Sequence, residues 1–177
     1  MASLCVTGVC YAPPPGAAAD SVTFGPHDVR SVFHVEKSEN QNQVHYGVRL
    51  DAACHPQGNS PVFAYWRRLR NDVRVDEPLV GPGTRVYGAS NEQTVQVTAQ
   101  GGHVETYVRA LKRLTIAVDI QKGKEGCVAV PMVTLHGERV KLLRAYLQLG
   151  RFGITVKYVD VYGLREKDSQ QVTEQFR

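Results

Sequence analysis

The chain has 177 residues, of which 42% are hydrophobic and 21% charged, and its formal net charge at pH 7 is +4. This length suits one domain with a self-supporting core, because a chain of this size buries roughly 70% of its unfolded surface. The modest positive charge favours anionic partners but disfavours nucleic acid, since dedicated nucleic-acid binders are usually far more basic. No apolar run approaches the roughly 20 residues of a membrane-spanning helix.

Residues 1–30 have neither a helical nor a strand period. Pro13, Pro14 and Pro15 impose extended polyproline geometry on this segment. Alanines precede Asp20 as in a signal-peptidase site, but the positively charged start of a signal peptide is missing. We expect residues 1–30 to form an extended arm and residues 31–177 to form a β domain.

The strand signal is steady from residue 31 onward. Residues 31–37 and 44–51 flank a polar turn and predict a β-hairpin. The second of these strands alternates clearly, which places His45 on its outward face. His34 is then expected opposite His45, with the two imidazoles close together. One face of this strand carries the apolar residues Val44, Tyr46, Val48 and Leu50.

The stretch that contains Trp66, the only tryptophan, predicts a central strand. It begins at Pro61, where a strand tolerates proline, and is rich in β-branched and aromatic residues. Trp66 is expected in or beside the core, because both faces of this strand carry large apolar groups. One face has Val62, Ala64 and Trp66, and the other has Phe63, Tyr65 and Arg67.

The remaining chain continues as short β segments. Residues 70–83 are rich in proline and glycine and predict a long connection. Residues 139–149 fit both a helical spacing and strand alternation, and the glycine-flanked loop that follows favours the strand. In the polar tail, Val172 and Phe176 are expected to anchor the chain. Further strands are expected at residues 84–89, 94–99, 104–119, 127–135 and 154–162.

These segments predict an all-β fold of about nine or ten strands with little helix. An antiparallel up-and-down β-barrel of the lipocalin-like kind and a β-sandwich both fit the pattern. We prefer the barrel because a closed meander removes exposed sheet edges.

The four cysteines, Cys5, Cys10, Cys54 and Cys127, permit three complete pairings. Cys5 with Cys10 would close a local loop, and Cys54 with Cys127 would join two distant connections. Four reduced thiols are the alternative. Disulfide bonds would favour export, to a periplasmic or extracellular location, over the cytoplasm.

No catalytic constellation emerges from the sequence. Histidine pairs with metalloprotease spacing, Cys-x-x-Cys, the Gly-x-Ser-x-Gly elbow, a phosphate loop and a dinucleotide fingerprint are all missing. We therefore expect no catalytic residues, no metal and no cofactor. Asp119 and Asp160 are interpreted as surface salt-bridge groups, and the histidines as scattered surface residues.

Three arginines accompany two aromatic side chains around the Trp66 strand. Arg67, Arg68 and Arg70 supply positive charge, while Tyr65 and Trp66 supply aromatic surface. Such a group can hold an anion or a base. The alternative is a solvated charged edge that discourages aggregation between strands. These five residues are the candidate ligand-binding residues.

Six segments of the chain form a recognisable set: residues 33–40, 44–51, 61–66, 77–79, 87–88 and 156–163. Together they resemble a family of small bacterial proteins that are catalogued only as a domain of unknown function. The likeness covers about residues 31–165, and it implies a compact β domain that is often exported. The family has no established catalytic residues to transfer.

Two functional hypotheses follow from the sequence. The first is a non-catalytic binding module, in which the interior or mouth of the barrel accepts a small or anionic ligand. The second is a structural subunit of a homo-oligomer or filament, assembled head-to-tail through residues 1–30. An enzyme that uses histidine or aspartate ranks last.

Overall fold

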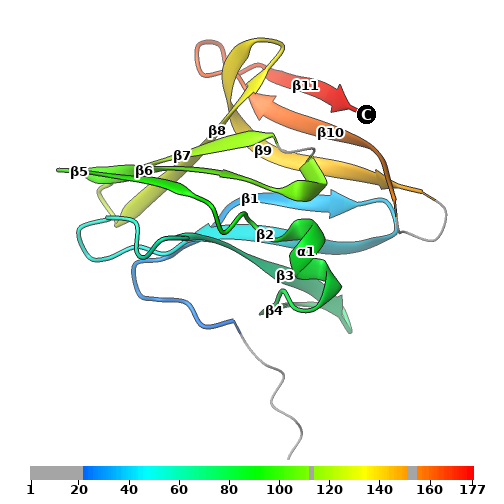
Figure 1. Cartoon of the computed structure of the whole chain (residues 1–177), viewed down its shortest axis with the longest axis horizontal. Helices are drawn as coiled ribbons and strands as arrows, with labels where there is room; N and C mark the ends of the chain where they lie inside the picture. Colours follow the sequence, from blue (N-terminus) through cyan, green and yellow to red (C-terminus); the bar gives the residue numbers. More distant parts are fainter. Residues whose placement is uncertain (1–21, 112–113, 151–154) are drawn as a thin grey trace, which may run out of the picture.

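The computed structural model describes residues 22–111, 114–150 and 155–177. Within them the chain forms eleven strands and two short helical segments, which confirms the predicted all-β class (Figure 1). The helical segments are α1 (Pro82–Tyr87) and the 3-10 turn η1 (Arg109–Leu111). The strands are β1 (Val29–Lys37), β2 (Asn40–Val48), β3 (Val62–Arg70), β4 (Val73–Pro78), β5 (Thr94–Thr98), β6 (Gly101–Tyr107), β7 (Thr115–Lys122), β8 (Cys127–Leu135), β9 (Glu138–Leu149), β10 (Val156–Leu164) and β11 (Gln171–Phe176).

The strands form one curled sheet with the shape of a half-barrel. Its order is β4-β3-β2-β1-β9-β8-β7-β6-β5, with β10 added along β9 and β11 added to β10. The terminal strands of this order, β4 and β5, do not pair with each other. Figure 1 shows the β5–β7 side of the curl lying across from β1–β3, with α1 beside β3.

Strand β9 joins the two sides of the curl. Its first residues pair antiparallel with β8, from Glu138 to Lys141. Its later residues pair in parallel with β1, from Arg144 to Leu147. Strand β10 runs antiparallel along the other edge of β9. The parallel pair β1–β9 departs from a simple up-and-down meander, in which every neighbouring pair is antiparallel.

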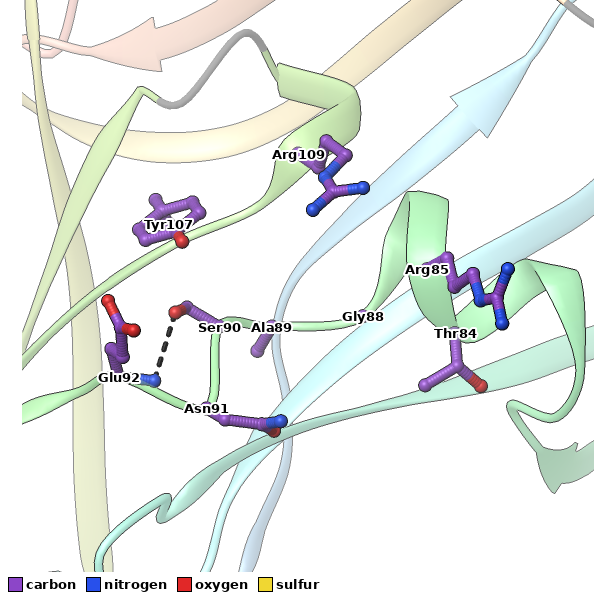
Figure 2. Close-up of a pocket in the computed structure, with 9 residues that line it drawn as sticks. All are labelled: Thr84, Arg85, Gly88, Ala89, Ser90, Asn91, Glu92, Tyr107 and Arg109. Carbon is purple, nitrogen blue, oxygen red and sulfur yellow. Dashed lines mark hydrogen bonds between the residues drawn. The ribbon is translucent and has the colours of Figure 1, made fainter.

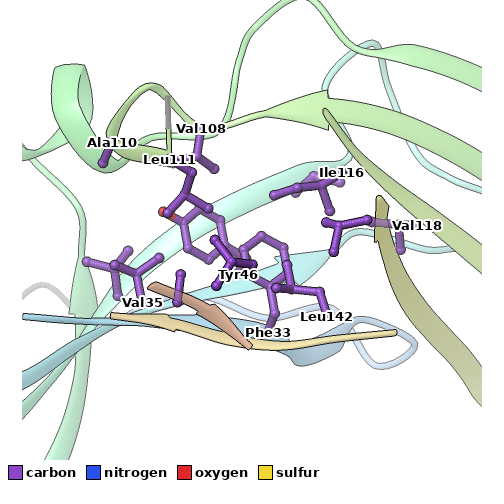
Figure 3. Close-up of a cluster of buried hydrophobic side chains, with 14 of the residues drawn as sticks. Phe33, Val35, Tyr46, Val108, Ala110, Leu111, Ile116, Val118 and Leu142 are labelled. Atoms are coloured by element: carbon purple, nitrogen blue, oxygen red, sulfur yellow. The ribbon is translucent and has the colours of Figure 1, made fainter. Parts of the chain in front are cut away.

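Apolar side chains from both sides of the curl meet in one core. The rings of Phe33 and Tyr46 stack with centroids 4.3 Å apart. Figure 3 shows these rings facing Leu111, Ile116 and Val118 of the opposite side. The predicted apolar face of residues 44–51 is confirmed, since Val44, Tyr46 and Val48 of β2 and Leu50 shortly after it are buried.

Trp66 belongs to this core, as predicted, and only 8% of its surface is exposed. Its indole packs edge-on against Tyr87 of α1, with ring centroids 5.7 Å apart. The Lys37 ammonium lies 4.7 Å from the indole centroid, and burial lowers the pKa of Lys37. Helix α1 therefore covers the end of β3 and closes the core beside β4.

Three of the predicted segments differ from the structure. Residues 104–119 were expected as one strand, but η1 separates β6 from β7 within them. Residues 84–89 were expected as a strand, but α1 occupies most of them, with a proline in its first turn and Gly88 N–H donating to the Thr84 carbonyl. Residues 70–83 contain strand β4, because Asn71 and Asp72 both adopt positive φ and form a tight hairpin turn. By contrast, residues 139–149 are strand β9, as favoured, and Val172 and Phe176 pack against the core.

A disulfide bond joins Cys54 to Cys127, which confirms that predicted pair. Their Cα atoms are 5.4 Å apart and the residues are separated by 73 positions. The bond ties the loop after β2 to the first residue of β8. The predicted pair of Cys5 and Cys10 lies outside the described residues. None of the helices in the described ranges is long and apolar enough to cross a membrane.

Candidate functional site

Strand alternation divides the five predicted ligand-binding residues between two faces of β3. Trp66, Arg68 and Arg70 share the inner face, which we define as the face turned toward the core. Tyr65 and Arg67 lie on the outer face, which β2 continues with His45. The two aromatic rings therefore do not form one platform, and the arginines belong to two separate charge groups.

The inner-face arginines share one carboxylate from β4. Glu77 contacts Arg70 Nε through Oε1 at 2.7 Å and Arg68 Nε through Oε2 at 3.3 Å. The Arg68 guanidinium also lies 5.2 Å from the centroid of the Trp66 ring. Two guanidinium groups against one carboxylate leave this group with an excess of positive charge.

Arg67 on the outer face is held by Asp76. Its Nε and Nη2 donate to the two carboxylate oxygens at 2.7 and 2.9 Å, and this hydrogen bonding raises the pKa of Arg67. The Tyr65 ring beside it is fully buried, and its hydroxyl donates to the Arg30 carbonyl at 2.5 Å. Burial raises the pKa of Tyr65 to about 12.

His34 and His45 stack across the β1–β2 hairpin, with ring centroids 5.1 Å apart, so the expected proximity is found. The expectation of scattered surface histidines fails for His45, which is only 5% exposed. Burial first, and then the nearby Arg67 charge, lowers the pKa of His45 to about 4. As a neutral ring it donates from Nε2 to Gln43 at 3.0 Å and accepts from the Ser31 hydroxyl at 2.8 Å.

The outer face continues from His34 into β9 and β10 as paired charges. Glu36 contacts His34 Nε2 at 3.1 Å and Arg144 Nη1 at 2.6 Å. The Arg144 guanidinium also lies 3.9 Å from the Tyr162 ring centroid. These contacts satisfy the charged groups within the sheet, so this face is chiefly a structural network. Across the described ranges, no three histidine, cysteine or acidic side chains gather as metal ligands would.

The two aspartates of the sequence analysis now have partners. Asp119 contacts His103 Nδ1 at 2.7 Å and Arg139 Nη2 at 2.6 Å. Asp160 accepts a hydrogen bond from Gln175 at 2.8 Å. The interpretation of Asp119 as a surface salt-bridge group is therefore confirmed, and Asp160 is a surface hydrogen-bond acceptor.

The first residues of the predicted arm that the structure describes lie against their own domain. The Phe24 ring meets Tyr65 edge-on with centroids 5.3 Å apart, and it lies 6.0 Å from Phe63. The Arg30 guanidinium is 4.8 Å from the Phe24 centroid. This contact explains how Tyr65 is buried on an outer face. Residues 1–21 lie outside the described residues.

A separate concavity lies between α1 and η1, and we name it the α1–η1 pocket (Figure 2). Its volume is about 330 Å³. The walls come from α1, the connection to β5, the end of β6 and the start of η1. The lining residues are Thr84, Arg85, Gly88, Ala89, Ser90, Asn91, Glu92, Tyr107 and Arg109.

The connection between α1 and β5, which lines the pocket, is fixed by hydrogen bonds. Ser90 N–H donates to the Tyr107 carbonyl at 2.9 Å, next to the bridge between Ala89 and Val108. The Gln93 amide donates to the Ser90 carbonyl at 2.8 Å and bonds both backbone groups of Val62. The pocket is therefore built on a connection that is tied to both sides of the curl.

Three charged side chains line the pocket without a counter-charge. Arg85 and Arg109 are exposed, and neither forms an ion pair with any residue in the described part of the chain. The same holds for the Glu92 carboxylate, although its backbone N–H donates to Ser90 Oγ at 3.0 Å. The Ser90 hydroxyl keeps its own proton for donation to a ligand. Two cations and one anion that have no ion-pair partner within residues 22–111, 114–150 and 155–177 thus line one hollow.

Sequence reasoning missed this pocket. Arg109 stands close to Lys112 and Arg113 in the sequence and so belongs to a run of cations. Arg85 and Glu92 carry no motif, and residues 84–89 were interpreted as a strand. Pro82 is the residue from which α1 could have been predicted, because proline is favoured in the first turn of a helix. Even with that helix, its approach to η1 depends on contacts between distant segments.

Comparison with known proteins gives one match. A family model described as Domain of unknown function (DUF4833) matches residues 33–175. The match begins within β1 and includes most of β11, so it covers nearly the whole described sheet. Comparisons with curated proteins and with solved structures found no match.

Proposed function

The chain belongs to the DUF4833 family, and because that family is described only as a domain of unknown function, we propose a function from the pocket itself. The domain is proposed to be a non-catalytic binding module that takes a small anionic ligand in the α1–η1 pocket. One observation carries this proposal: Arg85 and Arg109 line the same hollow, and neither has a counter-charge in the described part of the chain.

Guanidinium groups suit this role because their donors match the oxygens of carboxylates and phosphates in pairs. The donors of an arginine in a bidentate ion pair are already used, whereas those of Arg85 and Arg109 have no partner among the described residues. The hollow of about 330 Å³ fits a small molecule, since small-ligand sites usually span about 300–1,000 Å³. The positive net charge of the chain would also attract an anion.

The predicted ligand residues on β3 remain a weaker candidate site. Arg67 is committed to Asp76, while Arg68 and Arg70 share Glu77. Trp66 is buried under α1, so little of its ring can meet a ligand. The excess positive charge around Glu77 supports an anion there, but less strongly than the free arginines of the α1–η1 pocket do.

Isothermal titration calorimetry tests this proposal with two probes, inorganic phosphate and glutarate. We expect saturable binding of at least one probe, which weakens as salt is added because the contacts are exposed. The double variant Arg85→Gln/Arg109→Gln should lose about tenfold or more in affinity, since charged hydrogen bonds contribute about 1.5–3 kcal/mol each.

The matched control is Lys124→Gln, which removes a positive charge from an exposed turn outside the pocket. This variant should bind the probes as the unmodified protein does. Equal binding by the double arginine variant would refute the proposal, and so would failure of the unmodified protein to bind phosphate, glutarate and L-glutamate.

An exported location is part of this proposal. The bond between Cys54 and Cys127 supports it, because stable disulfide bonds form mainly outside the reducing cytoplasm.

A structural subunit is the second candidate function. It is favoured by strand β5, which ends the sheet order and carries exposed Val97 beside the half-buried Val95. An extended segment such as the predicted arm of residues 1–30 can pair with such an edge as an added strand. Its backbone would form hydrogen bonds with the unpaired backbone groups of the edge strand.

A further inference from the structure

We infer that the ligand of the α1–η1 pocket is zwitterionic and belongs to the acidic α-amino acids, with two carboxylates and one ammonium group. This inference rests on the proposed function, because it names the ligand class of the same pocket. It goes further in assigning a role to Glu92.

Glu92 places a negative charge on a pocket that is otherwise positive. Its carboxylate has no ion-pair partner among the described residues, and it lines the same hollow as Arg85 and Arg109. Figure 2 shows Glu92 beside Tyr107, on the side of the pocket away from α1, whereas Arg85 extends from α1. The two signs of charge are therefore separated across the hollow.

A purely anionic ligand would be attracted by the arginines and repelled by Glu92. A site discriminates between ligands by such repulsion as well as by attraction, so Glu92 should lower the affinity of the pocket for simple anions. A ligand that carries an ammonium group toward Glu92 turns this repulsion into attraction. The free carboxylate is thus better explained by a zwitterion than by phosphate or a simple diacid.

The charges of an acidic amino acid complement those of the pocket. Two guanidinium groups match two carboxylates, and one carboxylate on the protein matches one ammonium group. The backbone at Glu92 is fixed, because its N–H donates to Ser90 Oγ and the Ser90 N–H donates to the Tyr107 carbonyl. The Ser90 hydroxyl lines the same hollow and can donate a further hydrogen bond to a carboxylate.

Calorimetry with three matched probes tests the inference. The probes are L-glutamate, glutarate, which lacks the amino group, and N-acetyl-L-glutamate, in which the amino group is neutral. The unmodified protein should prefer L-glutamate to each of the other two by about tenfold, the usual size of one charged hydrogen bond.

The variant Glu92→Gln supplies the second half of the test. It should bind L-glutamate more weakly and glutarate at least as well, so that the preference falls to about twofold or less, since the charged bond is gone. Glu92 is exposed on a connection, so the fold should tolerate this change. The control Glu166→Gln removes an exposed carboxylate outside the pocket and should keep the full preference.

The outcomes separate this inference from the proposed function. If glutarate or phosphate binds the unmodified protein at least as well as L-glutamate, the inference fails while anion binding stands. If the preference for L-glutamate persists in Glu92→Gln, the assignment of Glu92 is wrong. If L-glutamate, glutarate and phosphate all fail to bind, both proposals fall together.

Discussion

His45 is a polar residue that lies on the outer face of the sheet and is nevertheless buried. The ring is covered by His34 on one side and by Tyr65 on the other, at centroid distances of 5.1 and 5.7 Å. Both ring nitrogens have partners, Ser31 and Gln43, which satisfy a neutral imidazole. Alternation correctly places this residue on the outer face, but it does not reveal that the face is covered there.

The lowered pKa of His45 predicts a loss of stability in mild acid. The unfolded chain binds a proton at this ring below about pH 6.5, whereas the folded chain binds it only near pH 4. Stability from His45 is therefore present above pH 6.5 and is lost as the pH falls through 4. The full difference is on the order of 3 kcal/mol.

Urea unfolding at pH 7, 5.5 and 4.5 measures this contribution. In the variant His45→Gln the free energy of unfolding should fall less over this range than in the unmodified protein. His27→Gln is the control, because His27 is exposed. An unchanged pH dependence in His45→Gln would contradict the assignment.

At the scale of elements, alternation predicted most strands but not their partners. The strands at β2, β3, β7 and β10 follow from apolar residues at every second position, which is local information. The parallel neighbour of β1 is β9, more than a hundred residues later, and nothing local specifies that pairing. Strand β4 was missed because the prolines and glycines of residues 70–83 predict a connection. Helix α1 was missed because six residues hardly distinguish a helical period of about 3.6 from a strand period of about 2.

The candidate site was less predictable than the fold. The five residues on β3 were chosen by closeness in sequence, and the period of two in a strand sends neighbours to opposite faces. The α1–η1 pocket instead combines Arg85 with Arg109, from two elements whose approach depends on the curl of the sheet. Arg109 was visible as part of a cation run, but its partner in space was not.

The bond between Cys54 and Cys127 links two elements and should be a major source of stability. In the chain-entropy model a crosslink that spans 73 residues contributes about 4 kcal/mol. The double variant Cys54→Ser/Cys127→Ser should lower the free energy of unfolding by about this amount. Chemical denaturation with and without a reductant measures the difference.

Two controls accompany this experiment. The reductant should destabilise the unmodified protein but should leave the double serine variant unchanged. Peptide mass mapping without reduction should recover Cys54 and Cys127 in one linked peptide pair. Alkylation of both thiols in the native protein would show that the bond is not formed.

At the scale of the whole molecule, the open ends of the sheet decide whether copies can associate. Strands β4 and β5 end the sheet order, and neither pairs with the other. Phe24 packs on the outer face of β3, and residues 1–20 precede it in the sequence. The assembly hypothesis requires those residues to reach a neighbouring copy.

Deletion of residues 1–20 tests assembly directly. If the arm joins copies, light scattering should give a multiple of the 19.6 kDa chain mass for the full-length protein and a monomer for the truncated one. The truncation retains Phe24, so its contact with Tyr65 is preserved and the domain should stay folded. A monomeric full-length protein at high concentration, or equal assembly of both forms, would exclude this role.

The parallel pair β1–β9 also sets the order in which the molecule can be completed during synthesis. The hairpin of β1 and β2 emerges from the ribosome early, but the residues that cover the free edge of β1 begin at Arg144. Pairings across such a distance form slowly, because the closure entropy of the long loop must be overcome first. A nascent chain that stops short of β9 therefore exposes the β1 edge. Chaperones would be expected to bind the incomplete chain at that edge.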